Sequence, residues 1–382
     1  MRHFLLFLIL MLTPLLAQNT GRTVFLNGYG EWVYGKSDGN EYLAGNEAGN
    51  YDRTNLSLAL LIQTDTPLTI SAQVFWANTR ENESEVGLDY VFALWKFSDA
   101  LKFLAGQVKQ PFGIYTEIYD VGTARPFFSL PQSVYGNGGL VTKAYRGLGF
   151  SGYLPVGESM ELSYDLYGGK LDLEAVNPIG LLVTGTDKGS GLSEDNGALQ
   201  ESDVKNMVGG RLVLHGILDR LDLGASAFYG HEEGDEDGVQ SDEYNYSYGF
   251  QGEYFGNYSE LRGEWVLHAD EDGYKTTGWY VENAFRFRVN YQVVARYEDA
   301  NLDEQLEVPA GLSNLFKHRE FALGFNYWFN TQFVIKTSVH WVEGNRYALP
   351  EGGYPEAADL TDWGSQLDSK TRLFMLGAQF SF

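Results

Sequence analysis

Apolar and polar residues alternate with a period of two along most of this chain. Between Pro67 and Ala77, and again between Glu320 and Phe329, every second residue is apolar. Successive side chains of a β-strand point to opposite faces, so each such segment predicts a strand with one apolar face. These segments are about as long as a tilted strand that crosses a bilayer.

Similar segments recur from one end of the chain to the other. The alternation is clear in Thr54–Gln63, Pro67–Ala77, Val86–Lys96, Ser159–Tyr167, Asp219–Gly230, Glu243–Phe255, Thr277–Arg288, Tyr291–Glu298, Glu320–Phe329 and Gln332–Val342. It is weaker in Val24–Tyr34, Leu101–Lys109, Arg146–Leu154, Asp203–His215 and Tyr258–His268. With a C-terminal strand, these segments predict about sixteen strands, and an even number is typical of bacterial membrane barrels.

The last ten residues, LFMLGAQFSF, form one more alternating segment. One apolar face is shared by Phe374, Leu376, Ala378, Phe380 and Phe382. A strand that faces lipid and closes a barrel needs such a face. We therefore expect this strand to pair with the segment near Val24–Tyr34 and to place Phe382 at the periplasmic rim.

The connections between these segments alternate in length. Short ones are expected at Asp65-Thr66, Ser98–Ala100, Pro155–Glu158, Gly216–Leu218, Gly256-Asn257, Val289-Asn290 and Asn330-Thr331. Long ones are expected at Gly35–Asp52, Asn78–Glu85, Gln110–Tyr145, Gly168–Ser202, His231–Asp242, Ala269–Thr276, Asp299–Arg319 and Gly344–Lys370. Short periplasmic turns opposite long external loops are the expected asymmetry of an outer-membrane barrel. The sequence thus predicts an all-β fold, a transmembrane antiparallel β-barrel.

Composition agrees with a sheet protein and limits the possible partners. The chain has 382 residues, of which 15% are aromatic and 45 are glycine. Its mean hydropathy of -0.26 is too polar for a helical membrane protein, but it fits a barrel in which every second strand residue faces lipid. The net charge of -24 argues against a nucleic-acid partner, because phosphates would be repelled. The absence of cysteine excludes disulfides and thiolate chemistry.

The N-terminus has the pattern of a secretory signal peptide. Arg2 and His3 precede the apolar run Phe4–Leu16, and Ala17 supplies a small residue at the cleavage point. We expect residues 1–17 to be removed and residues 18–382 to form a single outer-membrane barrel domain.

The connection Gln110–Tyr145 is unusually apolar for an external loop. Its large apolar residues include Phe112, Ile114, Tyr115, Ile118, Tyr119, Phe127, Phe128 and Leu130. In water they would form an aggregation-prone patch, and irregular loops of this length are uncommon unless they are functional. We expect this loop to fold into the lumen and to narrow the pore.

Two stretches at this loop resemble a known family. GQVKQPFG (Gly106–Gly113) and ARPFFSLPQSVY (Ala124–Tyr135) are similar to the matching stretch of porins related to the phosphate-selective porin O/P group. The terminal Phe382 resembles the C-terminal signature of bacterial outer-membrane proteins. The resemblance implies a diffusion channel for small hydrophilic solutes, usually a homotrimer, with this loop at the constriction. It also implies the outer membrane of a Gram-negative bacterium, with membrane lipid and lipopolysaccharide as partners and no cofactor.

Charged side chains at a constriction set ion selectivity. The loop carries only Lys109, Arg125 and Lys143 as bases, beside Glu117 and Asp120, so the phosphate preference of that group is not carried over. Parity along the strands places further bases on the lumen side, namely Arg211, Arg262, Arg286, Arg288, Arg296 and Lys336. The predicted pore constriction comprises Lys109, Glu117, Asp120, Arg125 and these six residues.

Two arrangements of these charges remain open. In one, Glu117 and Asp120 on the loop face Arg286, Arg288 and Arg296 across the pore and create a transverse field. In the other, the arginines pair with neighbours such as Glu264, Glu282 and Glu298 in a wet lumen, where pairing costs little.

A barrel enzyme and an adhesin or receptor are the alternatives to a channel. A barrel enzyme would need a nucleophile with a base, yet the sequence has neither a GxSxG nor an HExxH motif. An adhesin or receptor acting through its loops is a second alternative. The acidic loop His231–Glu243 lacks the EF-hand spacing, and we expect it to be solvated rather than to bridge divalent ions to lipid phosphates. We assign no catalytic, cofactor or metal site, and the sequence does not name the solute.

Overall fold

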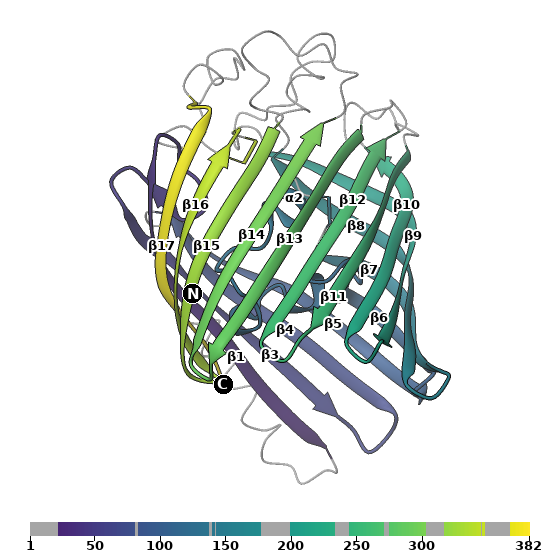
Figure 1. Ribbon diagram of the computed structural model, residues 1–382. Coiled ribbons are helices and arrows are strands. Elements are labelled where there is room, and N and C mark those ends of the chain that lie inside the picture. The colour runs from purple at the N-terminus through teal and green to yellow at the C-terminus, as the bar shows by residue number, and fades with distance from the viewer. Residues whose placement is uncertain are drawn as a thin grey trace.

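The computed structural model describes residues 22–80, 83–136, 140–141, 143–176, 199–233, 244–270, 275–302, 317–344, 346–347 and 367–382. In this part of the chain, sixteen long antiparallel strands form one closed β-barrel (Figure 1). The predicted signal peptide lies outside the described residues. Among the described residues, no helix is long and apolar enough to cross a membrane.

Each strand follows the previous one along the chain and pairs with it. The wall consists of β1 (Thr23–Asp38), β3 (Asn50–Gln63), β4 (Leu68–Arg80), β5 (Glu83–Ser98), β6 (Leu101–Lys109), β7 (Ala144–Val156), β8 (Met160–Val176), β9 (Leu199–Ile217), β10 (Leu221–Glu233), β11 (Tyr244–Phe255), β12 (Ser259–Asp270), β13 (Lys275–Arg288), β14 (Tyr291–Leu302), β15 (Lys317–Asn330), β16 (Phe333–Glu343) and β17 (Lys370–Ser381). A two-residue strand, β2 (Gly45–Asn46), lies in the first long connection and runs parallel to β1.

The barrel closes where its first strand meets its last. β1 pairs with β17 in an antiparallel register that runs from Tyr29 opposite Ser381 to Asp38 opposite Arg372. The backbones of Gly28 and Phe382 exchange two hydrogen bonds of 2.9 Å. The C-terminus lies at the end of the barrel that carries the short turns (Figure 1). The predicted pairing of the C-terminal strand is therefore confirmed.

The two faces of β17 show how the alternating pattern is used. Phe374 and Phe380 are about 40% exposed on the outer face, whereas Leu373, Met375 and Gln379 are buried on the inner face. The other strands follow the same rule, so a closed apolar surface surrounds the barrel. No lipid-facing edge is left with unpaired backbone groups, which a membrane demands.

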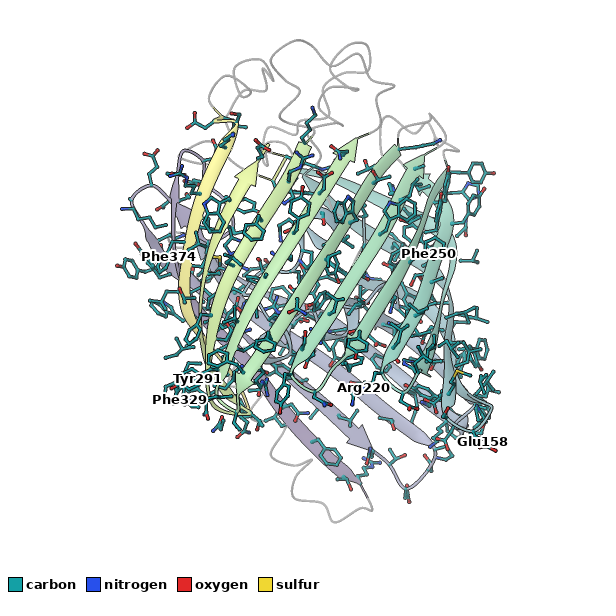
Figure 2. All side chains as sticks on the ribbon, in the orientation of Figure 1. Glu158, Arg220, Phe250, Tyr291, Phe329 and Phe374 are labelled. Carbon is teal, nitrogen blue, oxygen red and sulfur yellow. The ribbon has the colours of Figure 1, made fainter. Side chains whose placement is uncertain are left out.

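Aromatic rings form two bands on this outer surface. Near the short turns, rings contact one another from Phe287 through Tyr291, Tyr327 and Phe329 to Phe333. Tyr291 and Phe329 lie at that rim, whereas Phe250 and Phe374 project from the wall farther from it (Figure 2). The second band is built from the ring pairs Tyr248–Trp265, Trp279–Tyr297 and Phe321–Trp341. Two such girdles mark the two membrane–water interfaces of a barrel.

Several strands extend beyond the predicted segments at the long-loop end. β4 continues to Arg80 and β5 begins at Glu83, so the predicted long connection Asn78–Glu85 is wrong. β12 and β13 likewise extend to Asp270 and from Lys275, which shortens the predicted connection Ala269–Thr276. Beyond the lipid, both faces of a strand meet polar surroundings, so the pairing continues where the alternation stops.

Candidate functional site

The loop between β6 and β7 folds into the barrel, as predicted. It contains the short helices η1 (Thr116–Ile118), η2 (Gly122–Ala124) and α2 (Gln132–Tyr135), and α2 is visible behind β13 and β14 in Figure 1. Its large apolar side chains are buried between the loop and the inner wall, namely Phe112, Tyr115, Phe127, Phe128, Leu130, Val134 and Tyr135. This burial removes the apolar surface that an external loop would expose to water.

Buried glutamates on neighbouring strands hold the loop. Glu264 on β12 accepts hydrogen bonds from the Ile114 amide at 2.6 Å, the Tyr135 hydroxyl at 2.6 Å and the Tyr280 hydroxyl at 2.7 Å. Gly113, with φ of +69°, fits beside this group because a Cβ would lie 2.3 Å from Glu264 Oε1. Hydrogen bonds to a buried carboxylate are among the stronger ones in proteins, so they fix the entry of the loop.

The next two strands continue this row of carboxylates. Glu282 on β13 accepts a hydrogen bond from the Tyr115 hydroxyl, and Glu298 on β14 accepts one from the Ser133 amide at 2.8 Å. Here α2 lies directly on the wall, because a Cβ at Gly278 would be 1.9 Å from the Ser133 carbonyl oxygen. A glycine on β13 is thus what allows the helix to approach this closely.

The middle of the loop is attached to β15, β16 and β1. Asn326 donates to the Pro126 carbonyl at 2.8 Å, and the Lys336 ammonium donates to the Gly122 carbonyl at 2.9 Å. Arg125 forms an ion pair of 3.4 Å with Glu31 on β1. These attachments all lie on the half of the wall that runs from β12 through β17 to β1.

The opposite half of the wall borders a cavity of about 560 Å³. Its lining includes Tyr90 and Phe92 on β5, Lys102 on β6, Asp165 on β8 and Arg211 on β9. Lys109 at the end of β6 also lines it, and the loop contributes Pro111, Gly113, Ile114, Glu117 and Val121. The cavity thus lies off-centre, mainly between the edge of the loop and the wall of β4 to β9.

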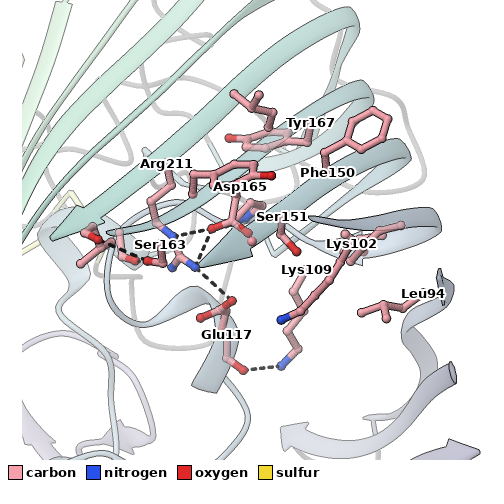
Figure 3. A pocket seen from close by; sticks show the side chains of 18 of the residues that line it. Leu94, Lys102, Lys109, Glu117, Phe150, Ser151, Ser163, Asp165, Tyr167 and Arg211 are labelled. Atoms are coloured by element: carbon pink, nitrogen blue, oxygen red, sulfur yellow. Dashed lines mark hydrogen bonds and ion pairs between the residues drawn. The ribbon is translucent and has the colours of Figure 1, made fainter. Parts of the chain in front are cut away.

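Charges of both signs meet at this edge of the loop. The Arg211 guanidinium lies 3.1 Å from Glu117 and 3.0 Å from Asp165, and it donates to the Gly113 carbonyl at 3.2 Å. Figure 3 shows Arg211 between the two carboxylates, with Lys109 reaching toward Glu117 from the other side. Glu117 is more than half exposed, so it faces the passage and also links the loop to β9.

A second ion pair stands at the base of the loop. Lys109 lies 3.0 Å from Asp120. Burial raises the pKa of the Asp120 carboxyl, and the charges of Lys109 and Lys143 more than offset this effect, so its pKa lies below the usual range. Asp120 is therefore ionised at neutral pH.

A β-bulge directs two successive residues of β5 toward Asp120. The register between β4 and β5 shifts between Gln73 and Val74, which leaves Asp89 without an opposite residue. Both Asp89 and Tyr90 then point inward, whereas the alternation before and after them is regular. Gln73 donates to Asp89 at 2.7 Å and to Asp120 at 2.9 Å, so it joins the wall to the loop.

Solved structures of outer-membrane proteins share this architecture. The outer membrane channel DcaP of Acinetobacter baumannii superimposes with a TM-score of 0.62 at 10% identity, covering 96% of this chain and 99% of that one. OmpF of Salmonella typhi gives 0.60 at 15% identity, covering 96% and 99%. The anion-selective porin of Comamonas acidovorans gives 0.55 at 11% identity, covering 94% and 100%. This chain has the fold of outer-membrane porins. No family model and no curated protein matches it.

The porin fold separates the predicted constriction residues into three groups. Lys109, Glu117 and Arg211 line the cavity, and Asp120 lies beside them. Arg125, Arg296 and Lys336 are buried between the loop and the wall. Arg262 pairs with Glu253 and Glu260 and lies over the Tyr115 ring, while Arg286 and Arg288 are exposed near the short turn after β13.

This distribution differs from the transverse field considered above. Glu117 and Asp120 pair with Arg211 and Lys109, rather than facing Arg286, Arg288 and Arg296. Arg296 pairs instead with Glu282, Glu298 and Glu320, which agrees with the alternative of pairing with neighbours. The reason is that the loop covers the inner face of β13 to β16 and excludes it from the passage.

Sequence reasoning missed Lys102 and the rings around it. Lys102 points into the cavity, and its ammonium lies 4.4 Å from the centre of the Tyr153 ring. Within the part of the chain that the structure describes, no carboxylate forms an ion pair with Lys102. Every second residue of Leu101–Lys109 points inward, and Lys102 is one of them. Apolar and polar residues alternate only weakly in this segment, so the sequence did not make this clear.

Proposed function

We propose that this protein is an outer-membrane diffusion channel, a porin, for small hydrophilic solutes or ions. The observation that carries the proposal is the off-centre cavity, lined by charged and polar side chains beside a loop that is anchored inside a closed barrel. A barrel whose lumen was filled by side chains would have no such passage. The porin fold of the solved structures supports this function.

The lining supports a channel of mixed charge. Lys102, Lys109 and Arg211 stand against Glu117, Glu161, Asp165 and Glu253. Fixed charges at a constriction set ion preference, and here the two signs nearly balance. The resemblance to the phosphate-selective porin O/P group thus supports the channel class, and we propose a broad solute range rather than phosphate preference.

The proposal also includes the location of this channel and its oligomeric state. Residues 1–17 are removed as a signal peptide, and the barrel resides in the outer membrane of a Gram-negative bacterium, in contact with lipid and lipopolysaccharide. Three copies assemble into a homotrimer, as the resemblance implies. The long connections face outward and the short turns face the periplasm.

Planar-bilayer recording tests this function directly. The purified protein is expected to insert as open channels of constant conductance. Liposome swelling with sugars, amino acids, dicarboxylates and phosphate then ranks the solutes. A folded, tightly inserted barrel that conducts no ions would contradict the proposal and favour an adhesin or an enzyme.

A further inference from the structure

A second polar cluster lies behind the loop, on the inner face of β14 to β16. It contains Arg296, Glu298, His318, Glu320 and His340, all of which are at most 1% exposed. None of these side chains reaches the cavity described above. Charged and polar groups this deeply buried need specific partners, because isolated they would be strongly destabilising.

Three of these residues direct donor atoms toward a common point. His318 Nε2 lies 3.9 Å from Glu298 Oε1 and 4.0 Å from Glu320 Oε2, and the three donor atoms all lie within 4.8 Å of one another. Bonds from a zinc ion to imidazole nitrogen and carboxylate oxygen are each about 2.1 Å long, so three donors around one ion lie about 3.4–3.6 Å apart. Movement of each donor atom toward the common point by about half an ångström brings all three within reach.

Two of these three atoms, His318 Nε2 and Glu298 Oε1, have no hydrogen bonds among the described residues, whereas Glu320 Oε2 accepts one from the Tyr42 hydroxyl. Neither ring nitrogen of His318 has a hydrogen-bond partner there, and neither does Glu298 Oε1. Arg296 Nε lies 3.2 Å from Glu298 Oε1, but without the geometry of a hydrogen bond. Buried imidazoles in proteins are almost always satisfied, and a metal ion is one way to satisfy them.

The charges of the cluster point to a cation as well. Glu282, Glu298 and Glu320 surround the single guanidinium of Arg296, so three negative charges meet one positive charge and leave two in excess. His340 supports the same carboxylate, because its Nδ1 lies 2.7 Å from Glu320 Oε1 and its Nε2 lies 2.8 Å from the Ser338 hydroxyl.

We propose that Glu298, His318 and Glu320 bind one divalent transition-metal ion, with zinc as the best match to one imidazole and two carboxylates. A divalent ion offsets the two excess negative charges. It also uses two donor atoms, His318 Nε2 and Glu298 Oε1, that lack hydrogen bonds among the described residues. The site is independent of the solute passage and does not rest on the proposed function.

The position of this site links the metal to the constriction loop. The other oxygen of Glu298 accepts the Ser133 amide of α2, and Arg296 donates to the Ser129 carbonyl at 2.9 Å. The Tyr42 hydroxyl, from the connection after β1, donates to Glu320 at 2.6 Å. A metal that fixes the two glutamates thus also fixes the loop and this connection, as supporting hydrogen bonds do at metal sites.

Zinc binding to the folded full-length barrel tests the proposal. Protein in detergent is dialysed against EDTA, freed of chelator, equilibrated with zinc chloride and assayed for metal and protein. The wild type is expected to hold one zinc ion per chain more than His318→Ala. Glu298→Gln, which keeps an oxygen for the Ser133 amide, is expected to weaken zinc binding at least about tenfold.

Matched controls separate this site from surface binding. His231→Ala removes another histidine, next to the acidic residues 232–243, and is expected to leave the zinc content unchanged. Retarded migration of the heat-denatured barrel on gels verifies that each variant folds. Zinc is also expected to raise the unfolding temperature of the wild type but not of His318→Ala, because a ligand stabilises only the state that binds it. Equal zinc content in folded wild type and His318→Ala would overturn the site.

Discussion

Arg211 and Arg296 both point into the barrel, yet only one of them borders the passage. Arg211 bridges Glu117 and Asp165 at the edge of the cavity. Arg296 is fully buried between three glutamates and the backbone of Ser129. The same residue type therefore borders the cavity in one place and holds the loop in the other.

Replacing Arg211 by glutamine should shift the channel toward cations. The change leaves Glu117 and Asp165 without their shared positive charge. A unit charge about 5 Å from a permeating ion in water contributes about 0.8 kcal/mol, or about a fourfold change in preference. Reversal potentials across a KCl gradient measure this shift.

Arg286→Gln is the matched control for this experiment. Arg286 is exposed near the short turn after β13, with its guanidinium 5.4 Å from the centre of the Trp328 ring. We expect its removal to change the reversal potential much less than Arg211→Gln. An equal shift in both variants would contradict the location of the constriction at the loop edge.

Replacing Arg296 by glutamine should destabilise the barrel. Removing one partner of a buried ion pair costs about 3–5 kcal/mol, because the remaining charges stay buried without compensation. Urea unfolding of the refolded protein in lipid vesicles measures this loss, with Arg286→Gln again as the control. An unchanged midpoint for Arg296→Gln would show that water compensates the three glutamates.

The sequence predicts which residues point inward, but not which of these face water. Parity along a strand follows from local geometry, so Arg211, Arg296 and Lys336 are all identified correctly as inward. Whether each is covered depends on where the loop lies in three dimensions. That path is set by contacts with strands far away in sequence, such as Glu264 with Ile114.

At the scale of whole elements, the constriction loop behaves as an inner core. Four strands in sequence, β12 to β15, each bring a buried glutamate to the inner wall, and the first three of these accept hydrogen bonds from the loop. This row sets the distance between the loop and the wall. The lumen therefore keeps a fixed cross-section without any covalent link.

Gly278→Ala is expected to displace α2 and to widen the passage. The added Cβ would meet the Ser133 carbonyl oxygen, and forcing atoms into a packed contact typically costs about 1–3 kcal/mol. The expected result is a higher and noisier single-channel conductance. Gly252→Ala on β11 is the control, because its Cβ would meet only the end of the Leu223 side chain, at 3.3 Å. Identical traces for the two variants would contradict this packing.

Strand positions followed from the sequence, whereas strand ends and the bulge did not. Each predicted segment corresponds to one strand of the barrel. Alternation reports only where one face meets lipid, so it does not detect the extensions to Arg80 and Asp270. The bulge at Asp89 is equally hidden, because Asp89 and Tyr90 both suit a wet inner face.

At the scale of the whole molecule, the excess negative charge acts on ions at a distance. The net charge of -24 includes the dense acidic stretch at residues 232–243, which runs from the end of β10 to the residue before β11. Such a field concentrates cations near the mouth of a channel. Its range depends on salt, because the screening length is about 10 Å at 0.1 M and about 30 Å at 0.01 M.

Cation preference should therefore rise as the salt concentration falls. We expect reversal potentials measured near 0.01 M KCl to be more cation-selective than those near 0.1 M at the same gradient ratio. Neutralising Asp235, Glu236 and Asp237 to their amides should reduce this difference. A preference that does not vary with salt would assign selectivity to the constriction alone.

The inward residues of the wall fall into those that the loop covers and those that line the cavity. The two groups differ in how many substitutions they tolerate. On β12 to β15, the inward residues fit the loop as closely as core residues fit one another, so most substitutions there disturb folding. On β5 to β9, some inward residues, such as Lys102, line the cavity and meet solvent, so fewer neighbours limit their size. New solute preferences can therefore arise by substitutions on that side alone, while the architecture that shapes the passage remains intact.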